Sequence, residues 1–397
     1  MPPQEPLIGV LNAGSSSLKF AIYEGETKVL TGQISGLGAS PVASAEGING
    51  EALEPPYIGN PIPSTAGELL PRLLPWARAE LKGRKLAALG HRVVHGGMHT
   101  ESQLVTSELL DGLDELVGLA PLHQPHSLSA IRIGLAFAPD LPQVACFDTA
   151  FHRSIPEIAQ AFALPRTLFE EGIRRYGFHG LSYEYIASVL PEGAPEVADG
   201  RVVVAHLGNG ASLCALKSRK SVATTMGFTA LDGLPMGTRC GDLDPGVMLY
   251  LMQQKKLSAA AIEDLLYWRS GLRGLSELSS DVRDLLSSRD PLASFAIEVF
   301  CYQTVRHIGS MAAALGGVDG IVFTGGIGEN AATIRSAICQ KCRWLGVELD
   351  ETANLQRGAC ISTPKSRVRV YVIPTDENVI IARDTRLLLD AKERAAG

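Results

Sequence analysis

The stretch from Val202 to Leu216, VVVAHLGNGASLCAL, constrains the fold of this chain more than any other. An apolar run meets the glycine-rich turn Gly208-Asn209-Gly210, and apolar residues then resume. This pattern predicts a β-hairpin whose tight turn exposes backbone N–H groups. The same pattern occurs near the N-terminus, where Leu7–Val10 and Leu18–Tyr23 flank the polar turn. We therefore expect a duplicated architecture whose two turns face one another across a cleft that suits a phosphate chain.

Beyond the hairpins, apolar strand-like segments alternate with segments of helical spacing, which favours an α/β fold. A strand is expected from Leu86, and others over 143–147, 319–324 and 367–373. Helices are expected over 66–81, 107–119, 127–137 and 183–190, and over most of 246–315 apart from 270–280. Residues 31–65 indicate a meander or loop region. The glycine-punctuated segment 224–244 indicates a long loop, and long loops within compact domains are usually functional.

The length and composition limit the classes of protein to which this chain can belong. A chain of 397 residues exceeds what one hydrophobic core usually covers, so two domains are expected. A net charge of −6 argues against a nucleic-acid partner, which would need a basic face. Neither a signal peptide nor a membrane span is visible, so we expect a cytoplasmic protein without a membrane partner. The seven cysteines are spread along the chain and indicate reduced thiols.

The polar turns suggest a nucleotide. Gly208-Asn209-Gly210 by itself could be a type I′ hairpin turn. Its recurrence at the first turn, with Lys19 nearby, favours an anion site, because glycine lets the backbone approach phosphate and lysine adds a donor. Neither turn is a Walker A loop. The segment Gly325–Asn330, GGIGEN, follows an expected strand and could pack beneath a purine or ribose, although a left-handed turn is the alternative.

Two arginines are candidates for binding an anionic group. Arg92 follows a buried strand, and Arg239 lies in the glycine-rich loop. Each could form a surface ion pair. Two guanidinium groups that converge on a cleft would instead bind a carboxylate and neutralise a phosphoryl group in transfer. His179 could be a buried, hydrogen-bonded histidine or a donor to a phosphoryl oxygen.

Two acids stand at the ends of expected strands, Asp148 and Glu377. Magnesium prefers one or two carboxylates together with phosphate and water, so these two residues could serve it. A helix N-cap is the alternative, and it is a stronger one for Asp376 than for Glu377.

Taken together, these segments resemble the acetate kinase family of acyl-phosphate-forming kinases. The motifs that carry the resemblance occur in the family's order: LNAGSSSLKF, GHRVVHGG, APLHQP, FDTAFH, RRYGFHG, HLGNGAS, MGTRCGDLDP, FTGGIGEN and TDENVIIARDT. The resemblance implies the duplicated actin/hexokinase/Hsp70-like (ribonuclease H-like) α/β fold, usually as a homodimer. It implies an N-terminal domain over 1–150, joined by a C-terminal helix over about 383–397, and a nucleotide-binding domain over 151–382.

The resemblance also assigns roles. Asn12 and Glu377 would hold Mg²⁺, or Mn²⁺ in its place. Arg92 would hold the carboxylate, while His179 and Arg239 would stabilise the transition state. Asp148 matches the family's active-site acid; because a carboxylate substrate is already ionised near pH 7, we expect Asp148 to position magnesium or Arg92. The residues implied for ATP or ADP are Lys19, His206, Leu207, Gly208, Asn209, Gly210, Asp281, Val282, Arg283, Gly326, Ile327, Gly328, Glu329 and Asn330.

The family's acyl pocket falls on Val94, Leu122, Phe178 and Ala230. Ala230 stands where the family usually has proline, and this smaller side chain could widen the pocket enough for propionate. Further departures from the family pattern are Gln124 for asparagine, Leu181 for threonine and Tyr183 for histidine.

The resulting hypothesis is reversible in-line transfer of the ATP γ-phosphoryl group to acetate, giving acetyl phosphate and ADP. The alternatives are a propionate or other short-chain carboxylate kinase, a sugar or polyol kinase of the same superfamily, and a non-enzymatic nucleotide switch. Two arginines favour a charged substrate over a sugar, and a switch protein would not need Arg92, His179 and Arg239 together.

Overall fold

The computed structural model describes residues 5–14, 17–37, 40–56, 67–356 and 358–396. The chain forms two compact units, and each is treated by itself below. Unit 1 comprises Met1–Phe151 and Asp376–Gly397, and unit 2 comprises His152–Thr375. The chain therefore re-enters unit 1 at Asp376, earlier than the position near 383 expected from the sequence. The reason is that α15 (Glu377–Ala396) packs against β1, β6 and β8 of unit 1.

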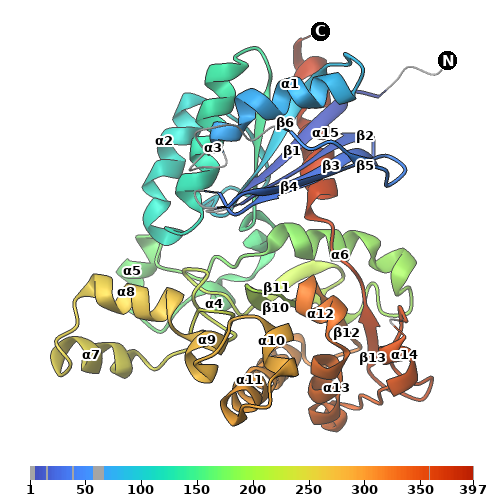
Figure 1. The fold of residues 1–397 in the computed structure, drawn as a ribbon. Coiled ribbons are helices and arrows are strands. Elements are labelled where there is room, and N and C mark those ends of the chain that lie inside the picture. The colour runs from blue at the N-terminus through green and yellow to red at the C-terminus, as the bar shows by residue number, and fades with distance from the viewer. Residues whose placement is uncertain (1–4, 15–16, 38–39, 57–66, 357, 397) are drawn as a thin grey trace. The chain divides into compact units, whose positions relative to one another are not determined.

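Unit 1 is built on an eight-stranded sheet in the order β5-β4-β3-β2-β1-β6-β8-β7 (Figure 1). Its strands are β1 (Leu7–Ala13), β2 (Ser17–Glu24), β3 (Thr27–Ser35), β4 (Val42–Gly47), β5 (Ala52–Leu53), β6 (Leu86–Val93), β7 (Gln103–Leu104) and β8 (Gln143–Phe147). Its helices, besides α15, are α1 (Leu70–Glu80), α2 (Ser107–Glu115) and α3 (Gln124–Phe137). Strands β3, β4 and β5 form the meander expected within 31–65, of which 57–66 lie outside the described residues, as do Ser15 and Ser16 of the first turn.

Unit 2 is built on a five-stranded sheet in the order β11-β10-β9-β12-β13. Its strands are β9 (Arg201–Leu207), β10 (Ala211–Lys217), β11 (Lys220–Thr224), β12 (Gly320–Thr324) and β13 (Arg369–Val372). Its helices are α4 (Glu157–Gln160), α5 (Arg166–Glu170), α6 (Gly180–Gly193), α7 (Pro245–Gln253), α8 (Ala259–Trp268), α9 (Gly271–Ser276), α10 (Val282–Ser287), α11 (Pro291–Leu315), α12 (Gly325–Asn330), α13 (Ala332–Lys341) and α14 (Glu351–Leu355).

The two sheets repeat one topology, as the paired hairpins predicted. In unit 1 the hairpin β1-β2 is antiparallel, β3 joins β2 antiparallel, and β6 and β8 extend the sheet in parallel from β1. In unit 2 the strands β9, β10, β11, β12 and β13 repeat these relations one for one. The duplicated α/β fold is therefore confirmed by strand order and direction.

A glycine lets α15 lie directly on the sheet of unit 1. A Cβ atom on Gly90 of β6 would lie 2.4 Å from Thr385 Oγ1 and 2.5 Å from Ile381 Cγ2, both on α15. Ile381 and Thr385 are fully buried. The close packing of α15 on β6 thus requires glycine at position 90, and this packing sets the position of Glu377 at the start of the helix.

At three places the structure settles an alternative or departs from the expectation. The connection Gly208-Asn209-Gly210 joins Leu207 to its partner Ala211, and none of its residues has positive φ, so it is not a type I′ turn. The segment GGIGEN forms the short helix α12, and its first residue, Gly325, has the left-handed φ of 75° that the alternative implied. Helix α9 occupies part of 270–280, where an interruption was expected. By contrast, 225–244 contains no helix or strand, as expected. Among the described residues, no helix is long and apolar enough to cross a membrane.

Candidate active site

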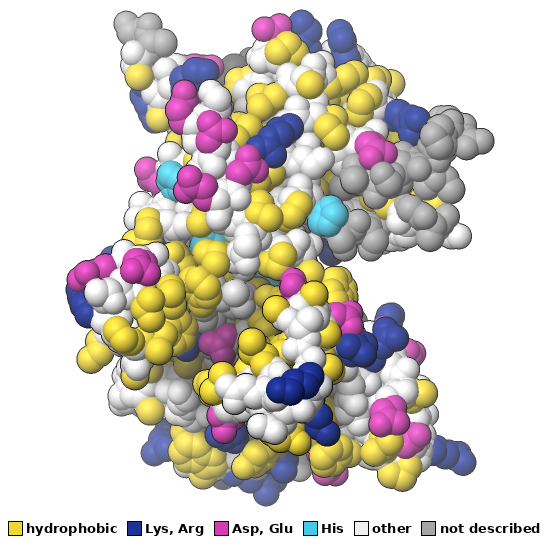
Figure 2. All heavy atoms as spheres, turned by 90° about the vertical axis from the view of Figure 1, so that its left-hand side faces the viewer, with side chains coloured by type: hydrophobic (Ala, Val, Ile, Leu, Met, Phe, Trp, Pro, Cys, Tyr) yellow, Lys and Arg dark blue, Asp and Glu magenta, His cyan; other side chains and the backbone are white. Residues whose placement is uncertain are grey.

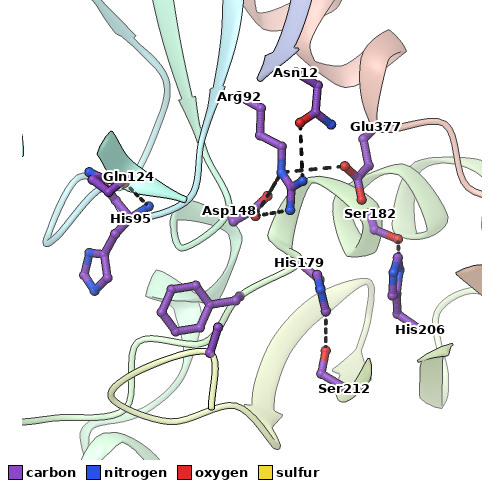
Figure 3. A network of polar contacts seen from close by, with 12 residues as sticks. Asn12, Arg92, His95, Gln124, Asp148, His179, Ser182, His206, Ser212 and Glu377 are labelled. Atoms are coloured by element: carbon purple, nitrogen blue, oxygen red, sulfur yellow. Dashed lines mark hydrogen bonds and ion pairs between the residues drawn. The ribbon is translucent and has the colours of Figure 1, made fainter. Parts of the chain in front are cut away.

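Polar side chains gather at the carboxyl ends of three neighbouring parallel strands in unit 1 (Figure 3). Asn12 lies near the end of β1, Arg92 near the end of β6, and Asp148 directly follows β8. Glu377 joins them from the first turn of α15. Open α/β sheets place ligand sites at this edge, so these four residues form a candidate substrate site within unit 1.

Arg92 is held mainly by Asp148. Its Nε lies 3.2 and 3.1 Å from the two carboxylate oxygens, and its Nη2 donates to Oδ2 at 2.6 Å. On the other side, Arg92 Nε lies 3.8 Å from Glu377 Oε2, and Nη1 lies 3.5 Å from Asn12 Oδ1. This fork-like pairing fixes the plane of the guanidinium group and leaves Nη1 on the side of Asn12.

The electrostatics of this cluster follow from burial and charge. Burial raises the pKa of Asp148 to about 6; Arg92 opposes this rise and Glu377 adds to it. Burial alone would lower the pKa of Arg92, but the charges of Asp148 and Glu377 raise it above its ordinary value. Arg92 therefore remains cationic, while a carboxyl group beside it titrates close to the physiological range.

The two acids at the start of α15 have different tasks. Asp376 Oδ1 accepts a hydrogen bond from Asn378 N at 3.2 Å, and Lys28 Nζ lies 2.8 Å from Oδ2. Asp376 thus caps the helix, which confirms the alternative raised for it from the sequence. Glu377 is the first helical residue, and its carboxylate faces Arg92.

Unit 2 contains a cavity of about 650 Å³ between the G-N-G turn, α10 and α12. Most of the residues that the family resemblance assigned to the nucleotide line it: Gly208, Asn209, Asp281, Val282, Arg283, Gly326, Ile327 and Asn330. Sequence reasoning missed three further lining residues, Ser280, Leu286 and Ala331. Leu286 lies four residues after Val282, so helical spacing from Val282 could have indicated it.

Behind this cavity, GGIGEN is fastened by groups that the sequence did not single out. The buried Arg335 guanidinium donates to the carbonyl oxygens of Gly328 and Glu329 at 2.9 and 3.0 Å. Glu329 Oε1 accepts hydrogen bonds from Gly325 N at 2.9 Å and Thr375 N at 3.1 Å. One carboxylate oxygen of Glu329 therefore joins the segments that follow β12 and β13.

His179 and Arg239 meet at the G-N-G turn. A Cβ atom on Gly210 would lie 3.2 Å from His179 Nε2 and 3.3 Å from Arg239 Nη2. The His179 ring stacks on His206 with centroids 4.4 Å apart, and its backbone is left-handed, with φ of 59°. Such a conformation is strained for a non-glycine residue and concentrates at functional sites. Leu207 lies fully buried at the end of the strand that carries His206.

Two contacts hold the chain around His179 and Arg239. The buried His152 places Nε2 2.9 Å from Phe178 O and Nδ1 2.8 Å from Ser221 Oγ. Because a carbonyl oxygen only accepts, Nε2 carries the proton, and burial lowers the pKa of His152 to about 4. Arg239 Nη1 donates to the backbone oxygen of Ala230 at 2.7 Å. The backbone next to His179 is therefore held by His152, and the side chain of Arg239 is held by the backbone of Ala230.

The remaining candidates divide between the units. Val94 and Leu122 belong to unit 1, whereas the buried Phe178 and the half-buried Ala230 belong to unit 2. Lys19 is exposed on β2 and lines a separate cavity of unit 1 with Gln33, Glu46 and Asn378. Gln124 Oε1 accepts a hydrogen bond from His95 N at 3.0 Å, and Gln124 Nε2 donates one to His95 O at 2.9 Å (Figure 3).

Asn12 and Glu377 present oxygen ligands of the kind that Mg²⁺ prefers. Among the described residues, no group of three or more His, Cys, Asp or Glu side chains is arranged to hold a metal. This donor set, one amide oxygen and one carboxylate with Asp148 close by, fits a magnesium ion that keeps water and substrate phosphate among its ligands.

Comparisons with known proteins agree with one another. The family model described as "Acetokinase family" matches residues 7–383. The chain is 53% identical to an acetate kinase of Rhodopseudomonas palustris, with 96% of this chain and 98% of that protein covered. It is 48% identical to one of Rhizobium meliloti, with coverage of 96% and 98%.

Two solved structures are similar over nearly the whole chain. The acetate kinase of Porphyromonas gingivalis is 36% identical with a TM-score of 0.85, covering 97% of this chain and 100% of that one. A propionate kinase from Francisella tularensis is 35% identical with a TM-score of 0.88, covering 96% and 98%.

Proposed function

Because the chain belongs to the Acetokinase family, we propose that it transfers the γ-phosphoryl group of ATP reversibly to acetate, giving acetyl phosphate and ADP. One observation carries the proposal. His179 and Arg239 both approach Gly210, and the same G-N-G turn contributes Gly208 and Asn209 to the cavity of unit 2. A phosphate donor held by the turn would therefore have a histidine and an arginine beside it.

The nucleotide occupies the cavity of unit 2. Val282, Leu286 and Ile327 supply apolar contacts for the base, and Asn330, whose Nδ2 donates to Gly326 O at 2.9 Å, keeps the α12 backbone in place. The phosphates extend along Gly208-Asn209-Gly210, where the absence of side chains at the two glycines lets oxygen atoms reach backbone N–H groups.

Arg92 binds the acetate carboxylate. Its Nε and Nη2 are engaged with Asp148, so the Nη1 side remains to face a substrate oxygen. Asp148 acts as a positioning residue that fixes the guanidinium plane. It need not remove a proton, because acetic acid ionises well below pH 7, much as glutamic acid does. The family resemblance makes Val94, Leu122, Phe178 and Ala230 the candidates for contact with the methyl group.

In the transfer step, a carboxylate oxygen of acetate forms a bond to the γ-phosphorus. The bond from this phosphorus to the β–γ bridging oxygen breaks, and ADP leaves with the electron pair. His179 and Arg239 donate hydrogen bonds to the equatorial phosphoryl oxygens, where negative charge is spread in the transition state. Asn12 and Glu377 would hold a magnesium ion, which when bound would neutralise charge on the phosphates. Catalysis is thus by positioning and charge stabilisation.

Acetate is favoured over propionate by the curated relatives at 48–53% identity, which are named acetate kinases. The propionate alternative rests on the small side chain of Ala230. One methylene is worth only about 1–3 kcal/mol of discrimination, so some activity on propionate is expected beside the main activity on acetate.

The protein acts as a homodimer. Exposed hydrophobic side chains gather on the face of unit 2 that carries α7 and α8 (Figure 2). On α7 alone Leu249, Tyr250 and Met252 are 54%, 52% and 48% exposed. Large exposed apolar patches mark interaction sites, and a second copy of the chain is the occupant consistent with the family. Leu249→Glu should shift the mass measured by light scattering from dimer to monomer, whereas Ile158→Glu, on α4 at a site that is 89% exposed, should not.

The decisive experiment measures ATP consumption with a panel of one- to four-carbon carboxylates and traps any acyl phosphate with hydroxylamine. We expect the hydroxamate of acetate as the main product. If no carboxylate yields a trapped product, the proposed function is wrong.

Arg239→Ala tests the role of the transition-state arginine. Loss of a charge-stabilising arginine at such a site lowers kcat by about 10³–10⁵. Arg219→Ala is the matched control, because among the described residues Arg219 pairs with Asp199 of the same unit at an exposed site. Near-normal kcat in folded Arg239→Ala would contradict the role.

A further inference from the structure

A buried chain of hydrogen bonds leads from a tyrosine to the candidate catalytic histidine. The hydroxyl of Tyr183 lies 2.5 Å from Ser212 Oγ, and Ser212 Oγ lies 2.9 Å from His179 Nδ1. Figure 3 shows Ser212 directed at the His179 ring. Tyr183 and Ser212 are fully buried, whereas the ring of His179 is only partly so. The chain therefore approaches the imidazole from the protein interior.

The direction of these bonds follows from counting donors and acceptors. In the part of the chain that the structure describes, Ser212 Oγ is the one hydrogen-bond partner recorded for the Tyr183 hydroxyl, so this hydroxyl donates to Ser212. Ser212 then needs an acceptor for its own proton, and His179 Nδ1 is the acceptor within reach. A lone pair must therefore stand on Nδ1, and the ring proton must be on Nε2.

We propose that Tyr183 is a positioning residue that, through Ser212, holds His179 as the neutral tautomer protonated on Nε2. This inference rests on the proposed function, in which His179 donates a hydrogen bond to a phosphoryl oxygen. Nε2 is the ring atom nearest to the position that a Cβ on Gly210 would take, so the hydrogen-bond chain directs the donor toward the phosphate-binding turn. If the proton were on Nδ1 instead, Nε2 would present a lone pair to the phosphoryl oxygens and repel them.

The groups around His179 favour the neutral form of its imidazole ring. His179 stacks on His206 at 4.4 Å, and the Arg239 guanidinium lies beside the same glycine. A positive charge on His179 would face the cationic Arg239 across Gly210. Burial also raises the pKa of Tyr183 well above its ordinary value, which keeps the phenol protonated as the first donor of the chain.

The test reads the tautomer directly. The full-length protein is labelled with ¹⁵N-histidine, and the Nδ1 and Nε2 shifts of His179 are assigned by comparison with His179→Gln. We expect the Nε2-protonated neutral pattern in the wild type at pH 7. In Tyr183→Phe, Ser212 is released to accept as well as donate, so the shifts should move toward a mixture of tautomers. Tyr176→Phe is the matched control, because its hydroxyl donates to the backbone oxygen of Gly172 instead.

Kinetics supply the second reading. Tyr183→Phe should lower kcat by about tenfold, the equivalent of one hydrogen bond, with KM values for ATP and acetate changed by less than about twofold. Ser212→Ala should produce the same mixture of tautomers, and this variant replaces Tyr183→Phe in the test if Tyr183→Phe does not fold.

An Nδ1-protonated ring in the wild type would overturn the proposal, as would an unchanged Nε2-protonated pattern in the folded variants. Wild-type kcat in folded Tyr183→Phe would also overturn it. Absence of hydroxamate in the wild type would refute the proposed function instead, and the NMR shifts would still report the tautomer.

Discussion

Gly90 links the packing of unit 1 to the candidate substrate site, and Gly90→Ala tests that link. The added Cβ would lie 2.4 Å from Thr385 Oγ1, 2.5 Å from Ile381 Cγ2 and 3.3 Å from the backbone oxygen of Ile381. The first two distances are about 1 Å shorter than ordinary contacts between such atoms. Because Ile381 and Thr385 belong to a regular helix on a central strand, the helix must move as a body.

The magnitude follows from this overlap. Overpacking a well-packed interior by one methyl group costs about 1–3 kcal/mol, and the contact with helix backbone places Gly90→Ala at the upper end. For a unit of this size, about 2–3 kcal/mol corresponds to a fall in Tm of about 4–12 °C. Glu377 lies one turn before Ile381 on α15, so its carboxylate should move away from Arg92. A displacement of about 1 Å at a reacting centre can lower kcat by about 10²-fold.

Gly112→Ala provides a control of opposite sign. Gly112 lies in α2 of the same unit, and a Cβ there would meet nothing within 4 Å. Replacing an unstrained helical glycine by alanine stabilises by about 1 kcal/mol. Calorimetry and the hydroxamate assay on both variants give the comparison. A Gly90→Ala protein that unfolds at or above the wild-type temperature would refute the packing argument, and a lowered Tm with unchanged kcat would refute the link to Glu377.

Three further outcomes are expected. Burial lowers the pKa of His91 and of His152 to about 4, so these groups bind protons less in the folded state, and acidification from pH 7 to 5 should cost about 2 kcal/mol for each histidine. Because burial raises the pKa of Asp148 to about 6, protonation of this group over the same interval should increase the free energy of unfolding by about 1 kcal/mol. If urea unfolding shows no net loss of stability between pH 7 and 5, these pKa values are wrong. Gly237→Ala would place its Cβ 2.1 Å from the side-chain oxygen of the asparagine in the G-N-G turn, so KM for ATP should rise at least about tenfold, and an unchanged KM would exclude the turn from nucleotide binding. Ala230→Pro should lower the ratio of kcat/KM for propionate to that for acetate by about 10- to 200-fold, and equal ratios in variant and wild type would exclude residue 230 from substrate choice.

Local patterns in the sequence indicated part of the candidate site. Strand-forming runs that end in Arg92 and Asp148 placed polar side chains at strand ends, and the two hairpin patterns predicted the duplication seen in the sheets. The glycine-rich segments 208–210 and 325–330 were indicated by local pattern, whereas the full set of nucleotide residues came from the family resemblance, and most of that set line one cavity. These features are carried by residues close together in the chain, whose alternation of apolar and polar side chains depends on element type alone.

The tertiary structure decided which distant groups meet. Arg92 and Asp148 are 56 residues apart, and β6 and β8 bring them together only because these strands are adjacent and in register. The partnership of Tyr183 with Ser212 depends in the same way on how α6 packs near β10. The carbonyl oxygens that Arg335 holds, and the re-entry of the chain into unit 1 at Asp376, have no local signal.

The hairpin at Val202–Leu216 separates what the sequence determined from what the tertiary structure decided. Its strands and its glycine turn were determined by the sequence, because alternation and glycine act within a few residues. The turn's conformation and the approach of His179 and Arg239 to Gly210 were decided by the tertiary structure. Local preferences select the element, whereas contacts between distant residues depend on strand order, register and packing, which no short stretch of sequence specifies.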